Sequence, residues 1–266
     1  MGGAIVLMYH RLGSGVLPGR EPGEDIYAVS TGTFSDHLEV LATSRCSVVS
    51  FESVADAWLD GRPLPERPVA LTFDDGNASD HAEALPALVR RGLKAAFFVS
   101  PALVGEKGYL AWSQLRELAD AGMTVGAHGL DHTPLSTLGD DDVRRQLREC
   151  RRLMQDRLGR RPDYLSLPGG AGGSRVVAMA LQEGFRLVAD SVPRRSYPAR
   201  RGGALPRFAV RGADTREGFR SLVEQDTLTL FRSSVRHRAL AGLRASVGET
   251  LYQKVRRAWG GQIPSA

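Results

Sequence analysis

Residues 69–76 read Val-Ala-Leu-Thr-Phe-Asp-Asp-Gly, an apolar run that ends in two adjacent carboxylates and a glycine. Such a short apolar run is typical of a buried strand, which predicts that Asp74 and Asp75 lie where this strand leaves its sheet. Two neighbouring carboxylates repel each other unless a cation or a proton lies between them. The stretch therefore indicates either a solvated turn or a site with chemistry, and the rest of the sequence has to decide between the two.

The chain around this stretch alternates about seven times between predicted strands and predicted helices. The expected strands are residues 5–9, 47–51, 69–73, 95–99, 124–127, 164–167, 185–189 and 205–210. The expected helices are residues 34–41 with Thr33 as N-cap, 54–59, 79–91, 113–121, 140–158, 174–182 and 215–224. This alternation favours an α/β fold with a parallel sheet, and the number of units favours a closed or nearly closed barrel.

Five polar residues come directly after predicted strands. They are His10, Asp74, Asp75, His128 and Asp190. In barrels of parallel strands, the rim formed by the carboxyl ends of the strands carries the active site. The sequence thus predicts that these five side chains meet at one rim, which argues against a plain turn at Asp74-Asp75.

His128 and His132 lie four residues apart in the segment His-Gly-Leu-Asp-His. On a helical turn, side chains at this spacing point to the same side and can share a metal ion, although surface helices also produce such pairs by chance. With one carboxylate of the Asp pair they would form the two-imidazole, one-carboxylate set that holds a catalytic divalent metal. The second carboxylate would then be free to act as a base towards water.

These residues resemble the polysaccharide deacetylase family, also known as the NodB homology or carbohydrate esterase 4 family. Residues 72–76 are similar to its first motif, and His128–His132 is similar to its H-(S/T)-x-x-H motif, with Gly129 in place of Ser or Thr. The resemblance covers about residues 4–220 of the chain. It implies a distorted (β/α)7-type barrel, in agreement with the alternation of strands and helices.

The resemblance also implies a role for each matching residue. Asp75, His128 and His132 would hold a divalent metal, Zn2+, and Asp74 would be the general base. Water activated by the base and the metal would attack the carbonyl carbon of an N-acetyl group, and the backbone N–H of Gly169 would help to stabilise the oxyanion. The implied reaction removes acetyl from an N-acetylated amino sugar in a glycan, a glycan precursor or a glycoconjugate.

The later motifs depart from the usual family pattern. Residues 166–170 read Ser-Leu-Pro-Gly-Gly where the family has R-x-P-(F/Y)-G, so the arginine that orients the base is absent, and Arg11 and Arg207 are candidates to replace it. Asp190 of the fourth motif is present, but Ser191 stands where tryptophan is usual. The C-terminal Leu-x-His motif has no match.

The N-terminal stretch Met8-Tyr9-His10-Arg11 offers a replacement for the missing histidine. A branch of the family that deacetylates exopolysaccharides begins with a similar strand, in a circularly permuted barrel. This likeness implies that His10 is the general acid that protonates the departing amine, with Asp190 as its orienting and charge-stabilising partner. A histidine that merely ends a strand is the simpler alternative.

The composition is ordinary for a globular protein, with 42% hydrophobic and 24% charged residues in 266. No apolar run is long enough to span a bilayer, and residues 4–9 form too short a run for a signal peptide, so we expect a cytoplasmic protein. The two cysteines, Cys46 and Cys150, lack metal-ligand spacing and are expected to be reduced.

The net charge of +5 comes from the C-terminal segment. Between Phe231 and Trp259 there are seven basic residues and one acidic residue, so the rest of the chain is near neutral and its charge does not indicate nucleic-acid binding. We expect a catalytic barrel over residues 1–225 and a basic amphipathic tail over residues 226–266. The helix expected at 228–259 either packs on the barrel wall or lies on the anionic inner face of the membrane.

Two other functions are compatible with these residues. One is metal-dependent hydrolysis of a small N-acyl metabolite or of another non-peptide C–N bond, because a fold alone does not fix a substrate. The other is a catalytically weak barrel that binds glycans. The combination of an acid, a base and a metal site argues against the second, because a pure binding module needs none of them.

Overall fold

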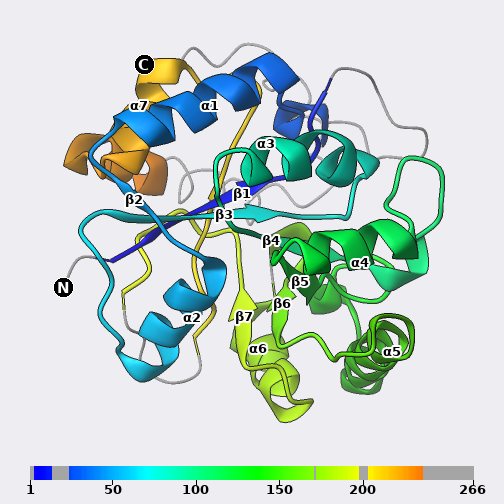
Figure 1. The fold of residues 1–266 in the computed structure, drawn as a ribbon. Helices are drawn as coiled ribbons and strands as arrows, with labels where there is room; N and C mark the ends of the chain where they lie inside the picture. Colours follow the sequence, from blue (N-terminus) through cyan, green and yellow to red (C-terminus); the bar gives the residue numbers. More distant parts are fainter. Residues whose placement is uncertain (1–2, 14–23, 171, 198–202, 236–266) are drawn as a thin grey trace.

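The computed structural model describes residues 3–13, 24–170, 172–197 and 203–235 (Figure 1). One parallel sheet organises the molecule. Its strands, in spatial order, are β7 (Leu187–Ala189), β6 (Tyr164–Ser166), β5 (Thr124–Ala127), β4 (Ala95–Val99), β3 (Pro68–Phe73), β1 (Ile5–Tyr9) and β8 (Phe208–Ala209). The short β2 (Ser47–Val48) pairs with β3 outside this path. The predicted α/β class with a parallel sheet is confirmed.

Residues 205–210 connect the two edges of this sheet. Leu205 forms a parallel bridge with Ala189 of β7, and β8 pairs in parallel with β1. The N–H of Val210 then donates to the carbonyl of Met8 at 2.9 Å. The parallel strands therefore curve round into a barrel, which residues 205–210 close. The sequence predicted one strand over these residues, whereas the structure has an isolated bridge at Leu205 and the two-residue strand β8.

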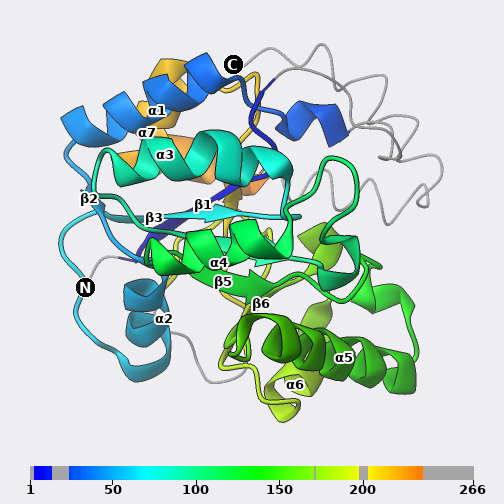
Figure 2. The same ribbon diagram turned by 45° about the vertical axis from the view of Figure 1, so that its right-hand side comes forward.

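Helices cover the outside of the strands, with α1 and α7 side by side over one part and α4, α5 and α6 over another (Figures 1 and 2). Their bounds are α1 (Thr31–Thr43), α2 (Phe51–Asp60), α3 (Leu85–Val89), α4 (Trp112–Asp120), α5 (Asp140–Leu158), α6 (Gly173–Gln182) and α7 (Arg216–Val223). Short 3-10 turns lie at Glu24–Tyr27, Pro101–Leu103, Leu135–Thr137 and Pro168–Gly170. In the described part of the chain, no helix is both long and apolar enough to cross a membrane.

The predicted N-cap of the first helix was wrong. The helix begins at Thr31, and its N-cap is Ser30, because the Ser30 hydroxyl accepts a hydrogen bond from the N–H of Thr33 at 2.9 Å. The helix predicted for residues 79–91 is found over residues 78–89, and it contains a π-helical turn, Asp80–Ala84, directly before α3. Of the predicted C-terminal tail, residues 227–235 are helical, and residues 236–266 lie outside the described residues.

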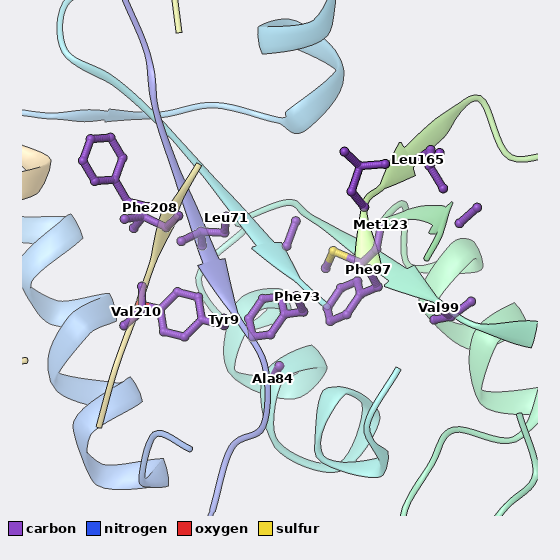
Figure 3. Close-up of a cluster of buried hydrophobic side chains, with 14 of the residues drawn as sticks. Tyr9, Leu71, Phe73, Ala84, Phe97, Val99, Met123, Leu165, Phe208 and Val210 are labelled. Atoms are coloured by element: carbon purple, nitrogen blue, oxygen red, sulfur yellow. The ribbon is translucent and has the colours of Figure 1, made fainter. Parts of the chain in front are cut away.

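Side chains alternate between the two faces of the strands and form two apolar clusters. Ile5 and Tyr9 of β1 belong to the larger cluster, between strands and helices, whereas Val6 belongs to the smaller one. Figure 3 shows the larger cluster, in which the rings of Tyr9, Phe73 and Phe97 stack in a row, with centroids 5.2 and 4.8 Å apart. This row ties the three neighbouring strands β1, β3 and β4 together.

The smaller cluster lies on the inward face of the strands. Phe51 of α2 packs edge-on against Phe98 of β4 and Tyr164 of β6, at centroid distances of 5.4 and 5.2 Å. The inward-facing apolar residues Ala70, Tyr164 and Leu205 are each followed, two positions later in the chain, by a buried polar residue. These inward polar residues are Thr72, Asp74, Ser166 and Arg207. The barrel interior thus changes from apolar to polar towards the carboxyl ends of its strands.

Candidate active site

Asp74 and Asp75 directly follow β3, and both are buried. Asp75 adopts a φ of +78° and Gly76 a φ of +74°; a Cβ on Gly76 would lie only 2.8 Å from a methyl group of Val99. Positive φ is unfavourable for a residue with a side chain, and strain of this kind collects at functional sites. This strained turn directs the two adjacent carboxylates to different partners.

Asp75 forms a cluster with His128 and His132. The Nε2 atoms of His128 and His132 lie 3.4 and 3.3 Å from Oδ1 of Asp75. Two ligands about 2.0–2.1 Å from a tetrahedral zinc ion are about 3.3 Å apart, so these separations suit such an ion. Burial would raise the pKa of the Asp75 carboxyl, but the adjacent imidazoles of His128 and His132 hold it well below its ordinary value, so the carboxylate is anionic.

The segment from His128 to His132 is not helical, so the helical turn predicted for it was wrong. Gly129 and His132 have φ values of +71° and +68°, and this irregular turn, rather than helical spacing, brings both imidazoles to Asp75. A Cβ on Gly129 would lie 3.0 Å from Cγ of Pro168. The close approach of Pro168 and the positive φ together explain why glycine stands where the family pattern has Ser or Thr.

A backbone contact fixes the orientation of His128. Its Nδ1–H donates to the carbonyl of Ser166 at 2.9 Å, because a carbonyl oxygen can only accept. In the neutral ring, the other nitrogen, Nε2, is then the one that offers a lone pair, and it faces Asp75. A hydrogen bond of this kind sets the tautomer and ring orientation that a metal-ligating histidine needs.

Arg207 holds the carboxylate of Asp74 inside the barrel. Its Nη1 and Nη2 donate to Oδ1 and Oδ2 of Asp74 at 2.8 and 2.7 Å, in the paired arrangement typical of arginine and carboxylate. The Arg207 side chain is fully buried. Of the two arginines predicted to replace the missing one, Arg11 and Arg207, it is Arg207 that makes this contact.

Further contacts use every nitrogen of Arg207. Nη1 also donates to the hydroxyl of Thr72 at 3.1 Å, and Nε donates to the carbonyl of Asp190 at 3.0 Å. The guanidinium carbon lies 5.4 Å from the centroid of the Phe98 ring. A buried cation is tolerated only when its donors are satisfied, so this set of acceptors fixes both the place and the plane of the guanidinium.

Ser166 also binds the carboxylate of Asp74, and it was not among the site residues predicted from the sequence. Its hydroxyl donates to Oδ2 of Asp74 at 2.8 Å and accepts from Nη2 of Arg207 at 2.7 Å. Oδ2 thus accepts two hydrogen bonds, whereas Oδ1 accepts one. Since each carboxylate oxygen offers two lone pairs, Oδ1 is the atom that can still receive a proton. Burial would raise the pKa of Asp74, but the charge of Arg207 brings it below its ordinary value.

Asp190 supports the loop after β7 and not His10. Its Oδ1 accepts from the N–H of Val192 at 2.9 Å, and its carbonyl accepts from Arg207. Among the described residues, no hydrogen bond or ion pair joins Asp190 to His10. The geometry therefore does not support the predicted pairing. Burial raises the pKa of the Asp190 carboxyl to about 6.

This raised pKa predicts that Asp190→Asn stabilises the protein in a pH-dependent way. A carboxyl whose pKa is higher in the folded state than in the unfolded chain favours folding at low pH and loses that contribution between about pH 4 and pH 6. The amide keeps an acceptor for Val192 without the buried charge. Allowing for partial exposure, we expect a gain of about 1–2 kcal/mol at pH 7.5 and none at pH 4. Urea unfolding at pH 7.5 and pH 4 measures the gain in the free energy of unfolding. An equal gain at the two pH values would contradict the prediction.

His10 directly follows β1 and lies near the carboxylates of Asp74 and Asp75. Burial lowers the pKa of its imidazole, while the nearby charges of Asp75 and Asp74 act in the opposite direction. Its ring stacks on Tyr27 with centroids 4.8 Å apart and an angle of 24°, and its buried Nδ1 has no hydrogen-bond partner among the described residues. Stacking on an aromatic ring, and not a carboxylate, therefore holds this imidazole. Its role as general acid stays a prediction.

Gly169 and Gly170 form a tight turn after β6, both with a φ of +66°. A Cβ on Gly169 would meet only Pro134, at 4.0 Å, whereas a Cβ on Gly170 would overlap the side chain of Ser191. The small residue at position 191, where the family pattern has tryptophan, thus packs directly on the turn that holds Gly169. The predicted use of the Gly169 N–H as an oxyanion donor stays a prediction.

A similar fold, built on parallel strands, is found in solved deacetylase structures. The Streptococcus pyogenes deacetylase PplD, solved in complex with acetate, has a TM-score of 0.71 and 20% identity, over 81% of this chain and 95% of PplD. IcaB from Ammonifex degensii has a TM-score of 0.70 and 26% identity, over 84% of this chain and 98% of IcaB. Both similarities extend over most of the described fold.

Sequence comparison gives the family. The model of the family "Polysaccharide deacetylase" matches residues 61–188. YxkH of Bacillus subtilis is 23% identical over 188 residues, which are 71% of this chain and 64% of YxkH. The peptidoglycan-N-acetylglucosamine deacetylase PgdA of Listeria monocytogenes is 30% identical over 146 residues, 54% of this chain and 30% of PgdA. The chain thus spans less than two thirds of these relatives. Residues 61–188, just under half of the chain, match the polysaccharide deacetylase family.

Proposed function

We propose that this protein removes the N-acetyl group from an N-acetylated amino sugar by metal-dependent hydrolysis. The observation that carries the proposal is the separation of two adjacent carboxylates into different environments. Asp75 faces two imidazole nitrogens, whereas Asp74 lies in a clamp of Arg207 and Ser166. The family match and the deacetylase name of a relative such as PgdA support the same reaction class.

Asp75, His128 and His132 would hold the metal. Two imidazole nitrogens and one carboxylate oxygen, with the ligand atoms within 4.8 Å of one another, suit a catalytic zinc ion. A bound divalent ion would supply Lewis-acid polarisation of the acetyl carbonyl and would lower the pKa of water. The strained φ angles of Asp75 and His132 fit a site that the surrounding fold, and not local preference, holds together.

The residues around this cluster would move the protons. Oδ1 of Asp74 would accept a proton from the attacking water as its oxygen bonds to the acetyl carbon. The C–N bond then breaks, and His10 would donate a proton to the departing amine; burial, which lowers the pKa of His10, makes its protonated form the stronger acid. The N–H of Gly169 would donate to the oxygen that becomes negative during the attack.

The test is release of acetate from N-acetylglucosamine oligomers by protein stripped of metal and then reloaded with Zn2+. We expect activity that is lost on stripping and restored by the ion, and no activity on N-acetyl amino acids. Cleavage of the amino acids but not of the sugars would favour the alternative substrate class, small N-acyl metabolites. Binding of the oligomers without acetate release by the zinc-loaded protein would favour a glycan-binding barrel.

A further inference from the structure

The helix at residues 227–235 is fixed to the barrel along one side. Asp226 precedes it and accepts from the N–H of Thr229 at 2.8 Å through its side chain, which caps the helix. Leu230 packs against the main apolar cluster, and the hydroxyl of Ser234 donates to the carbonyl of Pro193 at 3.1 Å. The first turns of the predicted tail are thus attached to the barrel in a defined orientation.

The opposite side of this helix exposes large apolar residues. Leu228, Phe231 and Val235 are 55%, 65% and 46% exposed. Their spacing of three and four residues places them on one face, which we call the apolar stripe. Single exposed apolar residues are common on protein surfaces, but three in a row on one helix face indicate an interaction site.

The sequence of this helix and of the segment after it is basic. Arg232 is exposed on the same helix, and residues 227–235 contain no Asp or Glu. The chain that follows, from 236 to 259, has six more basic residues and one acid, Glu249. Its apolar residues continue at intervals of three or four: Leu240, Leu243, Val247, Leu251, Val255 and Trp259. The sequence thus extends the pattern that the described helix begins.

We infer that the apolar stripe docks on an anionic lipid bilayer. An apolar helix face beside an exposed arginine has the chemistry of a helix that lies in the lipid headgroup region, and the basic sequence that follows it, with Trp259, has the composition that anionic lipid surfaces attract. A second copy of this chain is a poorer occupant, because symmetric pairing of two such helices would bring their arginines together. Since Leu230 and Ser234 fix the helix to the barrel, docking would hold the whole barrel at the lipid surface. This inference does not depend on the proposed reaction.

The experiment is flotation of the full chain with vesicles of phosphatidylcholine alone and with about a third of phosphatidylglycerol. We expect binding to the anionic vesicles only. The triple variant Leu228→Ser/Phe231→Ser/Val235→Ser should bind at least about tenfold more weakly, because the apolar anchor is gone. The matched control is Leu59→Ser/Val89→Ser, which removes side chains that are 41% and 52% exposed on α2 and α3; it should bind like the original chain.

Three results would overturn the inference. These are equal binding by the triple variant and the original chain, equal binding to neutral and anionic vesicles, and no vesicle binding together with a concentration-dependent dimer that the triple variant abolishes. Unchanged circular dichroism and an unchanged urea unfolding midpoint in both variants would exclude unfolding as the cause of a loss. Arg232→Glu supplies an independent second test, since reversal of this exposed charge should weaken anionic binding without removing apolar surface.

Discussion

Asp74→Asn is expected to lower the turnover number by about a thousandfold while the protein still binds its metal. The amide has the shape of the carboxylate but cannot take a proton from water. Asp74 makes its described side-chain contacts with Arg207 and Ser166 and none with His128 or His132, so its replacement leaves the three-residue metal cluster in place. Acetate release and bound zinc, measured on the same sample, separate the two effects.

His128→Ala is the companion variant, and it should lose both zinc and turnover. The substitution removes one of the three groups proposed to hold the metal and leaves the buried Asp75 beside one imidazole instead of two. His81→Ala is the matched control, because His81 is not one of the three clustered residues and its Nε2 instead lies 2.6 Å from Oε2 of Glu117. This variant should keep both its zinc and its turnover. Retained acetate release in Asp74→Asn would overturn the assignment of Asp74 as the base.

The strands and the rim residues could be predicted because their signals are local. Residues 95–99, 124–127 and 140–158 have the predicted bounds, since runs of apolar or amphipathic residues between breakers carry that information. The parallel topology then places strand ends together, which is why Asp75 and His128 could be expected at one rim before any distance was known.

The partners of the buried groups could not be predicted in the same way. Arg207 meets Asp74 across 133 residues of sequence, and Ser166 meets it across 92. Such contacts depend on which segments the barrel brings together, and the sequence offered two arginines without a means to choose. One signal was available: Ser166 stands where the family pattern has its arginine. A small hydroxyl at that position leaves room for a guanidinium that arrives from another segment.

The departures from the family pattern compensate one another in space. Ser166 and Arg207 together replace the missing arginine, and Gly129 allows the approach of Pro168. By contrast, the expectation that Asp190 orients His10 rested on motif position alone. The direction of the Asp190 side chain depends on a nearby N–H, that of Val192, which no motif describes. Sequence likeness thus located the site, whereas the contacts between its residues had to come from the structure.

Arg207→Met is expected to destabilise the protein by about 3–5 kcal/mol and to remove most of its activity. The substitution leaves the Asp74 carboxylate buried without its cation, and it frees the hydroxyls of Thr72 and Ser166 and the carbonyl of Asp190 from their donor. Urea unfolding measures the first effect, and acetate release measured below the unfolding range measures the second.

Two further variants separate charge pairing from the loss of a large side chain. Arg148→Met breaks a similar paired contact, with Glu183 at 2.7 and 2.9 Å, but the Arg148 side chain is 66% exposed and its charge is screened by water, so its loss should cost far less than the loss of Arg207. Arg207→Met/Asp74→Asn removes both buried charges and should be more stable than Arg207→Met alone, yet inactive. If the double variant is no more stable than the single one, the unpaired carboxylate is not the cause, and Arg207 matters through packing. If the double variant regains stability but not turnover, the role of Arg207 is to keep the buried Asp74 carboxylate ionised and in place.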